Sequence, residues 1–141
     1  MRVPKIQIIK GWVYIDGKKA KKKYMPDWYH CRDIFYDDEY VVKVENKDGE
    51  YFSNQNGQEY SRWKNVIEKS DKKYFAPCLK YCEAYLIQKR IPNRTFKRTD
   101  SVRELVWSLS KKYDLCDVEG DENKNWLMAD SRTPCIFDYG S

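Results

Sequence analysis

The sequence predicts an α+β fold in which an antiparallel sheet carries one packed helix and is followed by a reduced helix-plus-hairpin region. Three observations support this prediction. Short runs of β-branched and aromatic residues recur in pairs. The runs are separated by tight turns such as Asp16-Gly17, which join neighbouring strands into hairpins. Two longer stretches, 53–69 and 99–113, repeat apolar residues at the helical period.

The length of 141 residues predicts a single domain. The pattern divides it into N-terminal strands and a basic loop (1–31), a sheet-and-helix region (32–92) and a reduced C-terminal region (93–141). The composition is 41% hydrophobic and 16% aromatic, although the mean hydropathy is −0.90. Such aromatic content favours a folded chain over a disordered one.

Five scattered cysteines, without a Cys-x-x-Cys pair, accompany a single histidine. This set argues against a structural zinc site and fits a reducing compartment. The N-terminus lacks the apolar segment of a signal peptide, and no run approaches the roughly 20 apolar residues that span a bilayer. We therefore expect a soluble cytoplasmic protein without a membrane partner.

Positive charge is concentrated at the front of a chain whose net charge is +5, and Asp16 is the only acid among residues 1–23. The densest patch is Lys18, Lys19, Lys21, Lys22 and Lys23. One interpretation is a surface that binds nucleic acid or an acidic protein. The other is a solvated loop between two strands.

Residues 5–15 predict one or two strands, and residues 32–36 and 39–45 predict two more around an Asp37-Asp38 turn. Lys43 interrupts the apolar sequence of the last of these. Period 2 places it on the face of Val41 and Glu45, so the simple interpretation is an outward-facing lysine on a one-sided sheet.

A helix is predicted within 53–69, because Tyr60, Trp63, Val66 and Ile67 recur at helical spacing. Glu59 lies beside this apolar face. We expect it to point toward the sheet, and the alternative is an ordinary surface glutamate.

The C-terminal half predicts a hairpin, a helix and a second hairpin. The first hairpin joins 78–81 to 84–91, and the helix begins at a cap formed by Thr99, Asp100 or Ser101. The last hairpin pairs 126–129 with 135–137. Asn125 precedes its first strand and Asp138 follows its second, so both lie at its open end, where two oxygen ligands could share Mg²⁺.

Taken in order, these elements resemble the protein kinase fold from about residue 32 to residue 140. Lys43 resembles the strand lysine that holds the nucleotide phosphates, and Glu59 the helix acid that pairs with it. Asp117 resembles the catalytic base, while Asn125 and Asp138-Tyr139-Gly140 resemble the magnesium ligands, with Tyr in place of the usual Phe. The resemblance further implies that Gln88, Lys89 and Arg90 form a hinge that meets adenine.

Three features depart from the family pattern. No glycine occurs between Gly17 and Gly49, so the glycine-rich phosphate loop is missing. Asp117 lies eight residues before Asn125, a wider spacing than the family's. The chain ends at Ser141, before the activation segment and substrate-docking helices expected of the family.

The resemblance therefore implies a truncated kinase-like protein, similar to the small kinase-like proteins of bacteriophages. We expect a pseudokinase that binds and modulates or inhibits a host or defence protein in the host cytoplasm. The first alternative is an active minimal kinase that uses ATP and Mg²⁺ and phosphorylates itself or a small molecule. The second is a nucleic-acid-binding domain that uses the basic patch and nearby aromatic residues.

Overall fold

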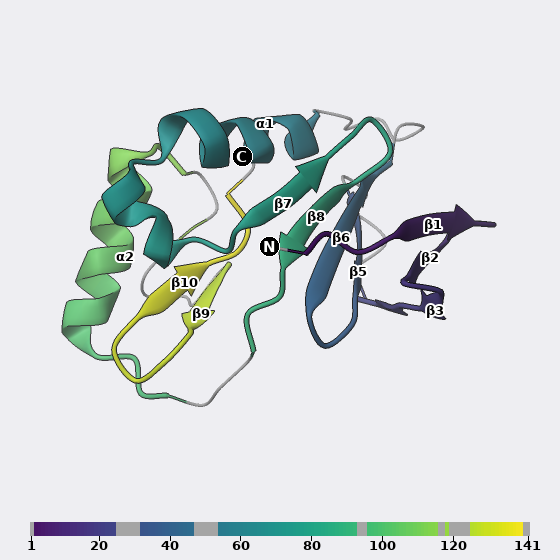
Figure 1. Ribbon diagram of the computed structural model, residues 1–141. Coiled ribbons are helices and arrows are strands. Elements are labelled where there is room, and N and C mark those ends of the chain that lie inside the picture. The colour runs from purple at the N-terminus through teal and green to yellow at the C-terminus, as the bar shows by residue number, and fades with distance from the viewer. Residues whose placement is uncertain are drawn as a thin grey trace. The chain divides into compact units, whose positions relative to one another are not determined.

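The computed structural model describes residues 2–24, 32–46, 54–92, 96–115, 118 and 125–139. Its contacts divide the chain into two compact units. The first comprises Met1–Gly57 and Cys78–Arg90, and the second comprises Gln58–Pro77 and Ile91–Ser141. The strand pairs are antiparallel and the helices few, which confirms the α+β class (Figure 1).

The N-terminal strands form a small sheet of the first unit, in the order β1-β2-β3. Its members are β1 (Ile6–Ile9), β2 (Trp12–Ile15) and β3 (Lys18–Lys19). Lys10-Gly11 and Asp16-Gly17 connect them, and all four residues have positive φ. Two-residue turns of this hand match the twist of the strands that they join, and glycine adopts them without strain. The predicted strands over 5–15 and the turn after them are confirmed.

A five-stranded sheet follows in the order β4-β5-β6-β8-β7. Figure 1 labels its strands β5, β6, β7 and β8. Its strands are β4 (Lys21–Lys22), β5 (Arg32–Tyr36), β6 (Tyr40–Glu45), β7 (Cys78–Tyr81) and β8 (Leu86–Lys89). Both predicted strand pairs are confirmed, although β8 is shorter than the predicted 84–91. The chain leaves this sheet after β6 for a helical segment, and β8 then inserts between β6 and β7.

The interpretation of the lysine run as a loop is wrong, because it forms β3 and β4. Between them lies Ala20, which is buried and whose N–H donates to the Val13 carbonyl at 2.9 Å. At this residue the chain passes from the small sheet to the larger one. A small apolar side chain suits such a close crossing, while the lysines on either side remain exposed.

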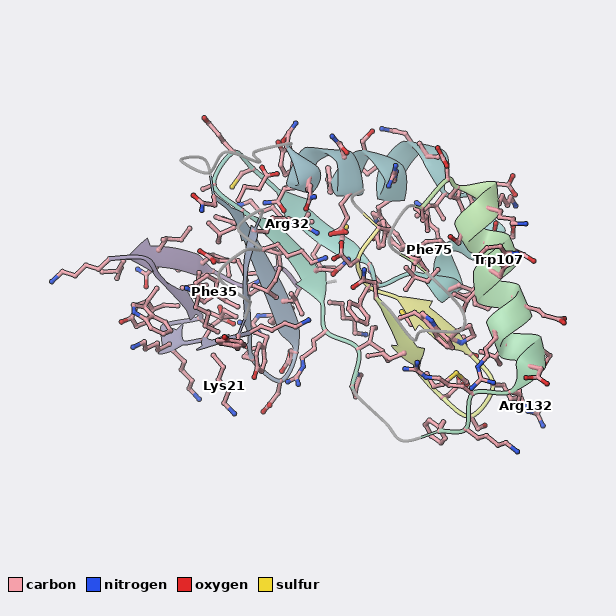
Figure 2. All side chains as sticks on the ribbon, turned by 180° about the vertical axis from the view of Figure 1, so that it is seen from behind. Lys21, Arg32, Phe35, Phe75, Trp107 and Arg132 are labelled. Carbon is pink, nitrogen blue, oxygen red and sulfur yellow. The ribbon has the colours of Figure 1, made fainter. Side chains whose placement is uncertain are left out.

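The two sheets of the first unit share one hydrophobic core. At the crossing, the edge of the Trp12 ring meets Phe35 of β5, with ring centroids 6.2 Å apart (Figure 2 labels Phe35). The buried residues of this core are Val13, Ile15, Ala20, Phe35, Tyr40, Val42 and Ile87. Packing of both sheets on this cluster holds β5 and β6 in register.

The helical segment after β6 changes type along its length. It starts as α1 (Gln55–Ser61), continues as the π-helical η1 (Arg62–Val66) and is followed by the 3₁₀ helix η2 (Lys69–Tyr74). The chain passes from the first unit to the second within α1. A π turn holds more residues than an α turn and therefore rotates the apolar face. Val66, predicted on that face, is accordingly 51% exposed, which is a correction.

The second unit packs α2 (Asp100–Lys112) and η2 with the hairpin of β9 (Trp126–Met128) and β10 (Pro134–Ile136). The Thr99 hydroxyl accepts a hydrogen bond from the Val102 N–H, so the predicted cap is confirmed. Phe75 pairs with Ile136 of β10 through an isolated parallel bridge. The predicted hairpin is therefore part of a core.

An ion cluster joins the end of α2 to η2 within the second unit. The Lys112 Nζ lies 2.8 Å from the Asp71 carboxylate and 3.0 Å from that of Glu68. The Tyr113 hydroxyl also donates to Asp71. Hydrogen bonds from Lys112 first, and from Tyr113 second, hold the pKa of Asp71 below its ordinary value of 3.8.

We expect this ion cluster to make part of the free energy of unfolding depend on pH in the acid range. Because the folded-state pKa of Asp71 is lowered, the stabilisation is present above about pH 4 and is lost as the pH falls through the lowered value. Asp71→Asn should lower the free energy of unfolding at neutral pH by about 1 kcal/mol, since the ammonium is partly exposed. Urea unfolding from pH 7 to pH 3 measures this, and a difference that does not shrink toward pH 3 would contradict it.

Candidate functional site

Lys43 lies in the interior of the larger sheet, on β6. Its register partners are Ile34 on β5 and Leu86 on β8. The residue is 3% exposed, so the interpretation as an outward-facing lysine is wrong. Burying an ammonium group is costly unless an anion or other acceptors compensate it. Lys43 is therefore a residue of basic type that is enclosed in the interior of the first unit.

Asn56, near the start of α1, was not identified from the sequence, yet it holds this part of the first unit together. Its side-chain amide donates to the Lys43 carbonyl at 2.9 Å, and its carbonyl accepts from the Arg32 guanidinium at 3.1 Å. Its backbone N–H donates to the Glu45 carboxylate at 3.2 Å. Figure 2 labels Arg32, which is buried like Asn56. The only sequence feature that could have indicated a buried partner for Asn56 is Arg32, a charged residue at the start of an apolar strand.

The residues predicted to form an adenine-binding hinge end β8. Gln88 is buried and paired with Val41 and Cys78, whereas Lys89 is exposed. The Arg90 backbone N–H donates to the Glu39 carbonyl at 2.8 Å. The Arg90 guanidinium donates to the Asp37 carbonyl at 2.8 Å and lies over the Tyr36 ring, 4.8 Å from its centroid. Arg90 thus stabilises the turn between β5 and β6.

Glu59 is fully buried, which excludes the surface-glutamate alternative. Its carboxylate accepts a hydrogen bond from the Tyr139 backbone N–H at 2.8 Å. Both residues belong to the second unit. The helix acid and the Asp138-Tyr139 segment, which are predicted as separate parts of the site, are therefore brought into direct contact.

Tyr139 is itself a core residue of the second unit. Its hydroxyl donates to the Ala76 carbonyl at 2.7 Å, and its own carbonyl accepts from the Arg62 guanidinium at 2.6 Å. The edge of the Phe75 ring meets it, with ring centroids 5.2 Å apart. A phenylalanine here would lack the hydroxyl that satisfies the Ala76 carbonyl. The segment is thus fixed at its backbone and at its ring.

Asn125 and Asp138 lie at the same end of the β9-β10 hairpin, as expected from the sequence. The Asn125 carbonyl accepts from the Phe137 N–H at 3.0 Å, and Asn125 has a positive φ of 61°. Left-handed backbone is one that asparagine tolerates better than most residues. Within the described ranges, no three His, Cys, Asp or Glu side chains gather as a metal site. Asp117, the predicted catalytic base, lies outside the described residues.

The five lysines of the basic patch are exposed and stand on β3, on β4 and just after them. Lys19 lies over the Trp12 ring, with its Nζ 4.0 Å from the centroid. Lys22 lies near Phe35 and 3.8 Å from the Asp33 carboxylate. The patch therefore combines positive charge with aromatic side chains.

The predicted residues divide between the two units. Lys43, Gln88, Lys89 and Arg90 belong to the first, while Glu59, Asn125 and Asp138 belong to the second. No helix in the described ranges is both long and apolar enough to cross a membrane. Comparison with family models, curated proteins and solved structures gives no match to this chain.

Proposed function

We propose that this chain is a kinase-like binding protein, a pseudokinase that binds and modulates or inhibits a partner protein. The observation that carries the proposal is the hydrogen bond from the Tyr139 N–H to the buried Glu59 carboxylate. It links Glu59, which resembles the kinase helix acid, to Tyr139, which follows Asp138 in the segment that resembles the metal-binding Asp-Phe-Gly motif.

The order of the elements supports the same proposal. Strands β5 and β6 precede a helix with a buried acid, and two antiparallel strands, β7 and β8, follow it. The lysine on β6 is buried rather than solvated. The kinase fold requires a strand lysine and a helix acid in this sequence order.

Two features favour binding over phosphate transfer. The sequence between β4 and β5 contains no glycine, whereas a kinase uses a glycine-rich loop there to bring backbone N–H groups to phosphate. At the end of β8, the Arg90 N–H already donates to the Glu39 carbonyl. The hinge residue therefore lacks a spare backbone donor for an adenine ring.

We expect no specific phosphate transfer when the protein is incubated with Mg²⁺ and γ-labelled ATP. The amounts of label on the protein and of released phosphate should be the same for the unmodified protein, Lys43→Met and Asp138→Asn. The reason is that, in a pseudokinase, neither Lys43 nor Asp138 takes part in phosphate transfer. Lys80→Met, which removes an exposed strand lysine, is the matched control. Transfer that is present in the unmodified protein and in the control, but lost in both site variants, would contradict the proposal.

The same experiment tests the alternative function, an active minimal kinase, which one observation favours. Asn125 and Asp138 lie at the same end of one hairpin, tied by the hydrogen bond between the Phe137 N–H and the Asn125 carbonyl. Amide and carboxylate oxygens are the donors that Mg²⁺ prefers. Transfer that is lost in Asp138→Asn, and also in Asn125→Ala when that variant is added to the series, would support this alternative.

A further inference from the structure

The small N-terminal sheet ends in an open edge. Its order is β1-β2-β3, and among the described residues β1 pairs with β2 alone (Figure 1). An unpaired strand edge presents a row of backbone donors and acceptors that can template a further strand. Such an edge is also the element that β-augmentation uses to bind an extended peptide.

The hydrogen-bond pattern identifies which backbone groups face outward. The Asp16 N–H donates to the Lys5 carbonyl, so Lys5 belongs to the set whose backbone faces β2. In an antiparallel pair this set alternates along the strand. Gln7 and Ile9 therefore face β2 as well, while the N–H and carbonyl groups of Ile6 and Ile8 face away from it.

The side chains along this edge are unusually apolar for a surface. Ile8 is 42% exposed and Ile9 is 49% exposed. Val3 and Trp12 are also exposed, so all the large exposed apolar side chains described in the first unit except Tyr24 lie on one hairpin and its approach. Scattered exposed apolar residues are ordinary, but a group on an open strand edge indicates an interaction surface.

The positive charge around β1 indicates which kind of strand can pair with its open edge. Lys5 and Lys10 flank β1 and are exposed, and the exposed lysines of β3 and β4 follow on the same unit. The one acid of residues 1–23, Asp16, is already paired with Arg2. A second copy would bring another set of these lysines to the same edge, and like charges gathered there are unfavourable. An acidic strand meets no such repulsion.

We infer that β1 binds an extended acidic segment of a partner protein, which adds to the small sheet as a fourth strand. The segment has apolar residues at alternate positions, to cover Ile8 on one face of the edge, and Asp or Glu at its ends, to meet Lys5 and Lys10. Main-chain hydrogen bonds to Ile6 and Ile8 supply affinity, and the side chains supply selectivity. This inference rests on the proposed binding role and names its partner class.

Fluorescence anisotropy of a labelled peptide, DEVTVTVED, tests the inference on the unmodified full-length protein. We expect saturable binding. The same peptide methylated at every central amide nitrogen should bind about tenfold more weakly or worse, because it cannot donate to the Ile6 and Ile8 carbonyls. A peptide with Lys in place of each Asp and Glu should likewise bind poorly.

Variants of the protein test the edge itself. Ile8→Pro removes an outward N–H and should weaken binding about tenfold, whereas Ile8→Ala keeps that N–H and should weaken it less. Lys5→Glu combined with Lys10→Glu should also weaken binding. Circular dichroism reports whether each variant folds, and the methylated peptide tests the same bond without altering the protein.

Four results would overturn the inference. They are absence of peptide binding, equal binding of the methylated peptide, tighter binding of single-stranded dT12 with a steep salt dependence, and dimerisation that Ile8→Lys abolishes. The third result would assign the basic surface to nucleic acid. Because phosphate transfer is measured separately, failure here leaves the kinase-like proposal to its own experiment.

Discussion

Replacing Glu59 with alanine is expected to lower the free energy of unfolding by about 2–4 kcal/mol. The side chain is fully buried, and its carboxylate accepts the Tyr139 N–H. Alanine would leave that N–H without this acceptor in a place that water does not reach, and would also leave a cavity. Urea unfolding at neutral pH, followed by tryptophan fluorescence, measures the loss.

Two further variants separate the hydrogen bond from the loss of side-chain volume. Glu59→Gln keeps the size and an acceptor oxygen, so it should cost less than the alanine variant. Glu104→Ala removes an exposed glutamate from α2 and should stay within about 0.5 kcal/mol of the unmodified protein. Equal stabilities of Glu59→Ala and Glu104→Ala would show that the Glu59 contact with Tyr139 contributes nothing to the fold.

This contact also shows what the sequence could not predict. The hairpins and the α2 cap follow from local patterns, such as two-residue turns or Thr99 before an apolar stripe, and they were predicted with nearly correct bounds. Glu59 and Tyr139 are 80 residues apart. No local pattern reports that a carboxylate on one helix will meet a distant backbone N–H, so the sequence only placed each residue on its own element.

Lys43 illustrates a second limit. Period 2 separates the two faces of a strand but does not tell whether one of them is solvated. Both faces of β6 carry a buried side chain, Val42 on one and Lys43 on the other, so the alternation of apolar and charged residues does not mark a one-sided sheet here. The exposed Val66 has a similar cause, since a π turn cannot be anticipated from an apolar stripe that assumes an unbroken α-helix.

Replacing Asn56 with alanine is expected to cost about 2–4 kcal/mol in the free energy of unfolding. Asn56 is buried and is both donor to the Lys43 carbonyl and acceptor from Arg32. Arg32 is also buried. Alanine would remove one acceptor from a guanidinium that cannot lose its charge, and such a loss is expensive in a low-dielectric interior.

The variant Asn56→Asp divides this loss between its two hydrogen bonds. Aspartate keeps an oxygen for Arg32, and adds an opposite charge, but it cannot donate to the Lys43 carbonyl. If Arg32 accounts for most of the energy, Asn56→Asp should be more stable than Asn56→Ala; if the Lys43 carbonyl does, the two should be equally unstable. Ser61→Ala, an exposed change on α1, is the control. A loss below about 0.5 kcal/mol in Asn56→Ala, equal to that of the control, would mean that the hydrogen bonds of Asn56 contribute little to the stability of the first unit.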